Sequence, residues 1–329
     1  MPGRIHVLGP QHPQHNLPAA LDKVGVEGPV AVVSAGWRHD EAQLDALARA
    51  SGRDLVHLPL YRWFDEVSAQ LPELATQWHE QQSQIRALKQ AYTIQLRGVA
   101  YVLDELERRG LRSASIQAEE IAFALQSIRT LDQRVLRRLD EVRAAFPQCA
   151  RPWELPEVAA LHEQSRHKLG HCQALLVSGG HVAVLLNRMR FFGLDDLARE
   201  HHQRGGHIFA WSGGAMVLSE RIVLFYDDPP HGAGDPELLD RGLGLVPGHL
   251  FFPHASERLR LHDRERVHRL ASRFSPYRCL TLDNGAWLEL EGELISDLGQ
   301  PDAARELSSD GTVQPLPGAA ADAAAQELG

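Results

Sequence analysis

The segment Val30–Ser34 is short, apolar and rich in β-branched residues, which predicts a strand buried on both faces of a parallel sheet. Residues Asp40–Ala50 predict a helix after it, and Asp54–Pro59 predict the next strand. Parallel strands need a long crossover between them, and a helix supplies it, so this order predicts an α/β domain with a parallel sheet. Ile5–Leu8 predicts an earlier strand.

From Asp65 the alternation stops, and apolar side chains recur three or four residues apart along two long stretches on either side of Gly110. This spacing predicts two helices that pack as an antiparallel hairpin inserted after the third strand. The hairpin could be a structural arm or dimer surface, a lid, or a partner-binding arm. The expected parts are 1–64 (first part of the α/β domain), 65–150 (hairpin), 151–317 (remainder of the α/β domain) and an Ala-rich tail, 318–329, expected to be frayed.

The net charge of −9 argues against nucleic-acid binding, which usually needs a basic face. Three widely spaced cysteines (Cys149, Cys172 and Cys279) form no disulfide framework, which favours a reducing compartment. No segment has the roughly 18–20 apolar residues of a membrane span, and the first residues lack signal-peptide character. We therefore expect a cytoplasmic protein that binds neither nucleic acid nor membrane.

Beyond residue 150 the sequence predicts strands at Ala174–Ser178, His207–Trp211 and Cys279–Leu282. A helix is expected from about Ser256 to Ser272. A β-hairpin is expected at residues 286–295.

Ser212 lies where the strand His207–Trp211 meets Gly213 and Gly214, which open a predicted helix. A nucleophile elbow needs this layout, because its tight turn exposes the serine hydroxyl and tolerates only small neighbours. Amides at the helix start could then stabilise an oxyanion. A serine between strand and helix is also a common N-cap, so this motif leaves both roles open.

Gly179 and Gly180 end the strand before this one. Ends of adjacent parallel strands share one edge of the sheet, where ligands bind. Amides of this pair, together with that of Gly213, could form an oxyanion hole. The alternative is a tight turn from strand to helix.

His254 ends an apolar run and precedes a predicted helix, a suitable place for a general base. A serine nucleophile needs such a base, and the base needs an acceptor that orients it. Asp283 and Asn284, just after a predicted strand, offer one. Arg258 and Arg260 are candidates to bind an acidic group of the substrate, or are solvated helix residues. No metal-ligand cluster has a recognisable spacing, so neither a metal nor another cofactor is expected.

Together these segments resemble the dipeptidase E and cyanophycinase family of serine peptidases, whose members have a class I glutamine amidotransferase-like, flavodoxin-like fold. The resemblance covers about residues 174–292, and the predicted hairpin has no counterpart in it. The matching motifs lie at residues 178–180, 211–215, 242–245, 253–254 and 282–286.

The resemblance implies that Ser212 is the nucleophile and His254 the base, with Gly213 and one of Gly179 and Gly180 forming the oxyanion hole. His181 stands where the family usually has Asn or Asp, so it is a candidate for altered substrate contacts. The family often has glutamate as the third catalytic member, whereas Asn284 is the nearest match here.

We therefore expect a serine hydrolase, a peptidase acting on small or acidic (aspartyl-type) peptides through an acyl-enzyme. The alternative is a catalytically silent relative that binds a ligand, a partner protein or a second copy of itself through the hairpin. Asparagine cannot stabilise an imidazolium by charge, so Asn284 favours the alternative. The pairing of Ser212 with His254 favours the enzyme.

Overall fold

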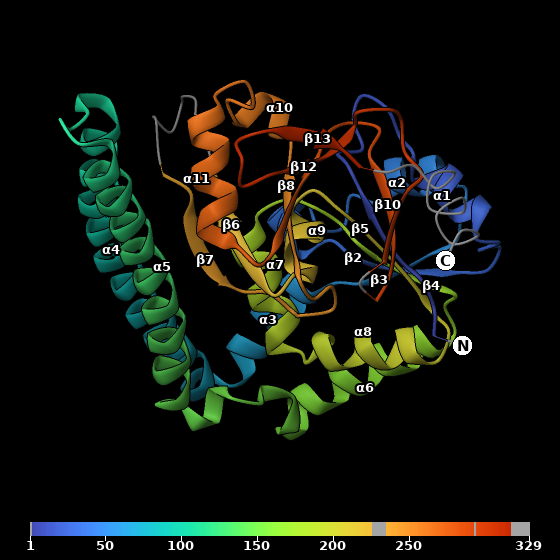
Figure 1. The fold of residues 1–329 in the computed structure, drawn as a ribbon. Helices are drawn as coiled ribbons and strands as arrows, with labels where there is room; N and C mark the ends of the chain where they lie inside the picture. Colours follow the sequence, from blue (N-terminus) through green and yellow to red (C-terminus); the bar gives the residue numbers. More distant parts are fainter. Residues whose placement is uncertain (1, 226–234, 293, 317–329) are drawn as a thin grey trace.

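The computed structural model describes residues 2–225, 235–292 and 294–316. Its central sheet has seven strands in the order β11-β10-β1-β5-β4-β2-β3, and helices cover both faces (Figure 1). The predicted α/β class with a parallel sheet is confirmed. The strands are β1 (Ile5–Leu8), β2 (Val30–Val33), β3 (Leu55–Leu58), β4 (Ala174–Val177), β5 (His207–Trp211), β10 (Trp287–Glu291) and β11 (Leu294–Asp297).

Strands β1 to β5 are mutually parallel, and β10 and β11 extend the sheet in antiparallel fashion. Every residue of β2 and β4 is buried, because side chains of alternating residues enter two separate apolar layers. One layer includes helix α1 (Leu17–Lys23) and the other includes α7 (Val182–Phe191). The pattern explains why these strands are continuously apolar.

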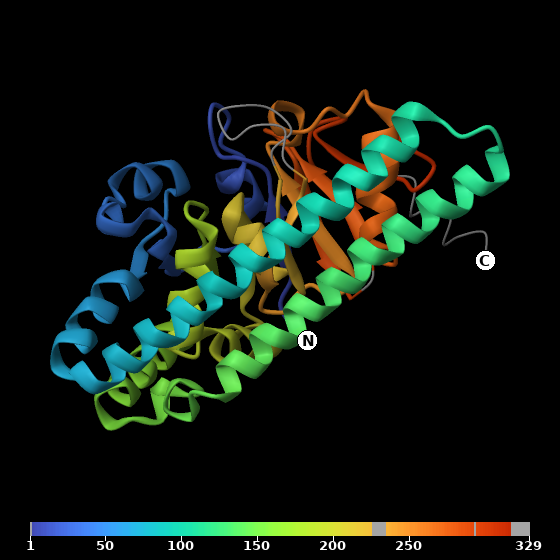
Figure 2. The same ribbon diagram turned by 90° about the vertical axis from the view of Figure 1, so that its left-hand side faces the viewer.

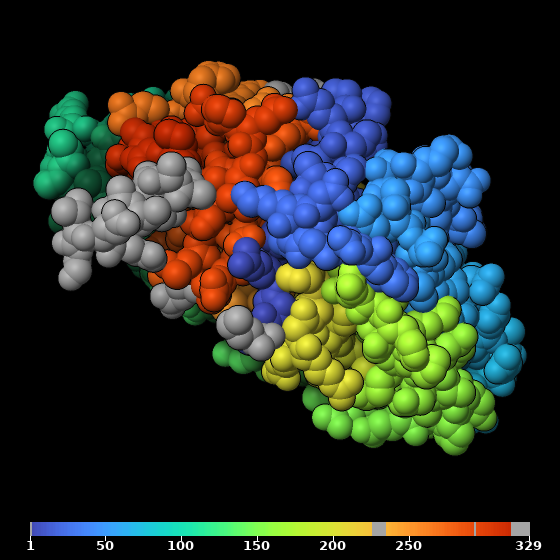
Figure 3. Space-filling model, turned by 90° about the vertical axis from the view of Figure 1, so that its right-hand side faces the viewer, coloured from blue at the N-terminus to red at the C-terminus, as the bar shows by residue number. Residues whose placement is uncertain are grey.

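A second sheet has the order β13-β12-β9-β8 and was not expected from the sequence. Strands β8 and β9 are parallel, and β12 pairs with β9 and with β13 in antiparallel fashion. The strands are β8 (His249–Pro253), β9 (Arg278–Leu282), β12 (Ala304–Leu307) and β13 (Val313–Pro315), and a separate two-stranded ribbon pairs β6 (Arg221–Leu224) with β7 (Glu237–Arg241). On the face seen in Figure 3, the N-terminal segment lies beside these C-terminal strands.

Residues 60–144 form three helices, α3 (Leu60–Gln70), α4 (Pro72–Arg109) and α5 (Ala114–Ala144). Helices α4 and α5 run side by side across one side of the molecule, and their connection projects beyond it (Figure 2). We call residues 72–144 the α4–α5 pair. It packs against α11 (Arg264–Phe274) and β7.

Several local predictions are corrected. The helix expected over residues 40–50 begins later, since α2 spans Asp45–Ser51 and a 3₁₀ segment, η1 (Ala35–Asp40), precedes it. The helix expected from Ser256 to Ser272 is divided into α10 (Ala255–Arg258) and α11, because Asp263 starts a new helix by accepting a bond from the Arg266 amide. The predicted tail at 318–329 lies outside the described residues. The other helices are α6 (Pro156–Gly170), α8 (Leu194–Gln203) and α9 (Gly213–Leu218).

No helix in the described ranges is long and apolar enough to cross a membrane.

A buried polar cluster joins the α4–α5 pair to the rest of the molecule. Arg273 of α11 donates to both carboxylate oxygens of Asp132 of α5 at 2.8 Å and to the Tyr92 hydroxyl of α4 at 2.8 Å. Tyr92 donates to Asp132 at 2.7 Å and accepts a bond from the amide of Leu238 in β7. Every member is therefore satisfied although the cluster is excluded from water.

Replacing Asp132 with alanine is expected to lower the free energy of unfolding by about 3–5 kcal/mol, because it leaves the Arg273 guanidinium buried without a counter-ion. Urea denaturation measures this change. The matched control is Glu141→Gln in the exposed Arg137–Glu141 pair of the same helix, which is expected to change stability by less than about 1 kcal/mol. Equal effects of the two substitutions would contradict the role given to the cluster.

Candidate active site

Ser212 occupies a strained turn between β5 and α9, with φ 50° and ψ −122°. Non-glycine residues rarely adopt positive φ, at a cost of order 1–3 kcal/mol. The strand ends at Trp211 and the helix begins at Gly213. Ser212 alone therefore forms the turn between them. The geometry is that of a nucleophile elbow, which presents a hydroxyl at the carboxyl end of a strand. The side chain makes no N-cap hydrogen bond, so the plain cap anticipated as its alternative role is not formed.

Glycines allow the neighbouring loops to approach this turn. A Cβ on Gly179 would lie 2.8 Å from the Cβ of Ser212, and one on Gly214 would lie 2.1 Å from the carbonyl oxygen of Val177. Gly180 has φ +106°, and a Cβ there would lie 2.6 Å from the backbone of Gly36. The backbone after β4 therefore lies directly against Ser212, where only glycine fits.

A cavity of about 630 Å³ opens at this edge of the sheet. Ser212 and His254 both line it, although they come from different sheets. Five other lining residues are relevant to the predicted site, namely Gly179, Gly180, Gly213, Glu257 and Arg258.

His254 directly follows β8 in a left-handed conformation with φ 58°. Its Nδ1 lies 3.6 Å from Oε2 of Glu257, one helical turn later. Burial, followed by the charge of Arg258, lowers the pKa of His254, while Glu257 and Asp283 oppose this change. The imidazole is therefore favoured in its neutral form, which can accept a proton.

Among the residues that the structure describes, no hydrogen bond joins the Ser212 hydroxyl to His254. Catalytic hydrogen bonds are often long in unliganded enzymes and tighten when substrate binds.

Asp283 and Asn284, the two residues expected to orient His254, have other partners. Asp283 accepts bonds from the amide and hydroxyl of Ser256 at 2.9 and 2.6 Å and pairs with Arg305 at 2.9 Å. The Asn284 amide donates to the carbonyls of Pro10 and Gln14. Asn284 thus ties the segment at residues 10–14, part of which lines the cavity, to the end of β9.

Glu257 is the residue that the sequence reasoning did not identify. The signal was available in the spacing, since residues three apart on a helical turn lie on the same side. Glu257 is exposed, and its carboxylate lies beside Nδ1 of the His254 ring.

The three candidate substrate-binding residues are placed differently. Arg258 lines the cavity. His181 is exposed, and its Nδ1 accepts a bond from the Val184 amide at 3.3 Å, which caps α7. Neither His181 nor Arg260 belongs to the described residues that line the cavity.

Within residues 2–225, 235–292 and 294–316, no group of three or more His, Cys, Asp or Glu side chains is arranged to hold a metal ion.

The fold and the site define an α/β protein with a strained serine, a histidine and glycine amides at one edge of a parallel sheet. The chain matches the family model of peptidase family S51 over residues 137–298. It is 27% identical over 175 residues to peptidase E of Actinobacillus pleuropneumoniae serotype 3 (strain JL03). This alignment covers 51% of this chain and 72% of that protein. Both matches support a dipeptidase E-like family of peptidases, which is the family that the resemblance predicted.

Two solved structures are also similar. A peptidase from an acI-B1 Actinobacterium has a TM-score of 0.48 and 13% identity, with coverage of 97% of this chain and 96% of that one. A putative peptidase E from Listeria monocytogenes EGD-e has a TM-score of 0.31 and 18% identity, with coverage of 42% and 64%.

The glycine at position 214 offers a direct test of the packing at this edge. Gly214→Ala is expected to lower the free energy of unfolding by at least about 1–3 kcal/mol, because its Cβ would collide with the backbone of β4. Gly98→Ala in α4 is the matched control, since no atom lies within 4 Å of its Cβ. That substitution should raise stability by about 1 kcal/mol through helix propensity. Urea denaturation of both variants checks the pair, and destabilisation by Gly98→Ala alone would refute the packing argument.

Proposed function

We propose that this chain is a serine peptidase that cleaves small acidic peptides of the aspartyl type through an acyl-enzyme. The observation that supports it best is the strained Ser212, which stands at a strand–helix turn and lines the same cavity as His254. Strain of this kind is retained where the surrounding structure fixes it, and it is concentrated at functional sites.

In the proposed reaction the Ser212 Oγ attacks the scissile carbonyl while His254 accepts its proton. Amides of Gly213 and of Gly179 or Gly180 stabilise the oxyanion of the tetrahedral intermediate. Protonated His254 then gives its proton to the leaving amine. A water molecule, activated by the same imidazole, hydrolyses the ester and frees Ser212.

We assign the orientation of the imidazole to Glu257. Its carboxylate is the one beside Nδ1 of His254, whereas Asp283 is bonded to Ser256 and Arg305. Asp283 acts on His254 through its charge, which raises the pKa of the imidazole. Asn284 acts through the loop that it anchors at Pro10 and Gln14.

The preference for an acidic substrate rests on Arg258, whose side chain lines the cavity near His254. A guanidinium suits a carboxylate because two parallel hydrogen bonds can form. Substrate binding by His181 and Arg260 stays a prediction, since neither residue is among those that line the described cavity.

We also classify the sheet as flavodoxin-like. Its parallel strands run β3-β2-β4-β5-β1, which has the form of the 2-1-3-4-5 order if the fifth position is filled by the first strand of the chain. Ser212 then stands at the carboxyl edge, where ligands bind in such sheets.

Ser212→Ala and His254→Ala are each expected to lower kcat by roughly 10⁴-fold or more, because the serine and its base act as one unit. Mass spectrometry of a peptide mixture that includes aspartyl and β-aspartyl peptides measures the loss. Ser127→Ala is the control, since this half-buried serine of α5 does not line the cavity around Ser212 and its hydroxyl donates only to the Phe123 carbonyl of its own helix. Cleavage that survives in the Ser212 variant would show that another group is the nucleophile.

The pH profile tests the surroundings of His254. A base must be neutral, so kcat/KM rises with pH through the pKa of His254. Arg258→Gln removes a charge that lowers this pKa, so the acidic limb should move to higher pH. Glu257→Gln removes a charge that raises it, so the limb should move to lower pH while kcat falls. Identical limbs in both variants and wild type would exclude these contacts.

A second candidate function is a catalytically silent protein that binds a partner or a second copy through the α4–α5 pair. The observation that favours it is the outward apolar surface of Ile94, Tyr101 and Phe123, which are 71%, 64% and 71% exposed. Absence of cleavage by folded wild type in the same peptide screen would favour this function.

A further inference from the structure

A second cavity, of about 350 Å³, lies where the α4–α5 pair meets the α/β domain. It shares none of its described lining residues with the cavity around Ser212. Its walls come from α4, the end of α5, the 3₁₀ segments η2 (Pro147–Cys149) and η3 (Pro152–Glu154), α7, the start of α8, and β7. The volume is within the usual range for small-molecule sites.

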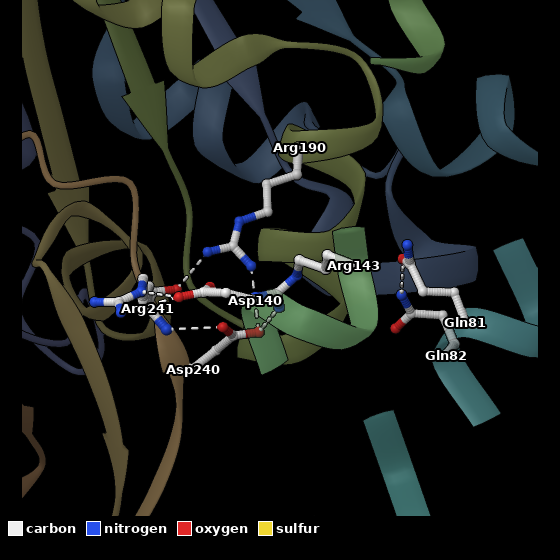
Figure 4. Close-up of polar contacts among 7 residues, drawn as sticks. All are labelled: Gln81, Gln82, Asp140, Arg143, Arg190, Asp240 and Arg241. Atoms are coloured by element: carbon white, nitrogen blue, oxygen red, sulfur yellow. Dashed lines mark hydrogen bonds and ion pairs between the residues drawn. The ribbon is translucent and has the colours of Figure 1, made fainter. Parts of the chain in front are cut away.

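Two arginines on one side of this cavity already have counter-ions (Figure 4). Asp240 of β7 pairs with Arg143 of α5 and, at 3.2 Å, with Arg190 of α7. Asp140 lies 3.7 Å from Arg143 and 3.0 Å from Arg241. These charges compensate one another.

Lys89 of α4 lines the same cavity without a counter-ion. No hydrogen bond or ion pair of its ammonium group occurs among the described residues. Burial lowers the pKa of Lys89 to about 8, with Asp240 opposing and Arg143 and Arg190 adding to the decrease. At pH 7 the group is therefore mostly protonated, and its charge is uncompensated.

Gln81, also a residue of α4, lines the same cavity and is only 3% exposed. Its side-chain oxygen accepts a bond from Gln82 at 3.3 Å, but its amide nitrogen has no partner among the described residues. Figure 4 shows both glutamine side chains extending from α4 toward Arg143. Gln81 lines the cavity, so this amide is available to donate a hydrogen bond to an acceptor on a bound ligand.

The rest of the wall is largely apolar. The side chains of Trp78, Ile85, Trp153, Leu186 and Leu239 line it. The Asp195 carboxylate also belongs to the wall, and burial raises its pKa. A small inorganic anion would leave the apolar wall without contacts, whereas an uncharged apolar ligand would leave Lys89 uncompensated.

We propose that this cavity is a binding site for a small organic carboxylate with an apolar body. The carboxylate pairs with Lys89 and accepts a hydrogen bond from the Gln81 amide, while the apolar part packs between the side chains of Trp78 and Trp153. This site is independent of the chemistry proposed for Ser212.

Isothermal titration calorimetry of the full chain with 3-phenylpropionate tests the site. Wild type is expected to bind this probe at least tenfold more tightly than 3-phenylpropan-1-ol or inorganic phosphate. Lys89→Met and Gln81→Leu should each weaken binding, the first by roughly tenfold or more, because an ion-assisted hydrogen bond is lost. Lys23→Met is the control, since Lys23 stacks over Trp287 far from this cavity in the fold, and it should bind like wild type.

The affinity of wild type should also fall as the pH rises past about 8, where Lys89 loses its proton, and Lys89→Met should not show this fall. The comparison is needed because other charged or titratable groups lie around the same lysine, namely Arg143, Arg190, Asp195, Glu237, Asp240 and the Cys149 thiol. Absence of binding to wild type, equal affinity for phosphate, or unchanged affinity in a folded Lys89→Met variant would overturn the proposal.

Discussion

The parallel register of β2, β4 and β5 determines the geometry at the carboxyl edge of the sheet. Val177 pairs with Ala210, so two residues further on Gly179 stands opposite Ser212. Val33 pairs with Val177, and three residues further on Gly36 stands opposite Gly180. The close approaches at both places follow from this register, because a shift by one residue would reverse the direction of every side chain. The backbone contacts around Ser212 therefore depend on pairing inside the sheet.

The local sequence pattern predicted much of the central sheet and the turn at Ser212. The strands at Val30–Val33, Ala174–Val177 and His207–Trp211 were predictable because buried parallel strands are short and continuously apolar. The turn at Ser212 was predictable because small residues follow a strand. The second sheet was not predictable in this way, because it depends on pairing between β9 and β12, which are distant in the sequence. The spacing of apolar residues within one segment does not indicate such pairing. For the same reason Asp283 seemed free to orient His254, whereas Arg305, brought from β12, pairs with it.

The α4–α5 pair shows how a few polar residues can fix the position of a long apolar stripe. Apolar contacts alone would allow two helices of this length to slide by a turn at modest cost. Asp132 and Tyr92 remove that freedom, because both must meet Arg273 of α11 to remain satisfied. A buried ion pair of this kind adds little net stability, but its disruption is costly. The cluster therefore specifies one arrangement of helices among several of similar apolar burial.

Four non-glycine residues in the described ranges have positive φ, namely Arg38, Ser212, His254 and Asp302. Two of them are the proposed nucleophile and base. Glycine would adopt the backbone of either position more readily, so selection for thermal stability alone would favour losing both side chains. At these two positions, the sequence that would be most stable therefore differs from the sequence that the proposed reaction requires.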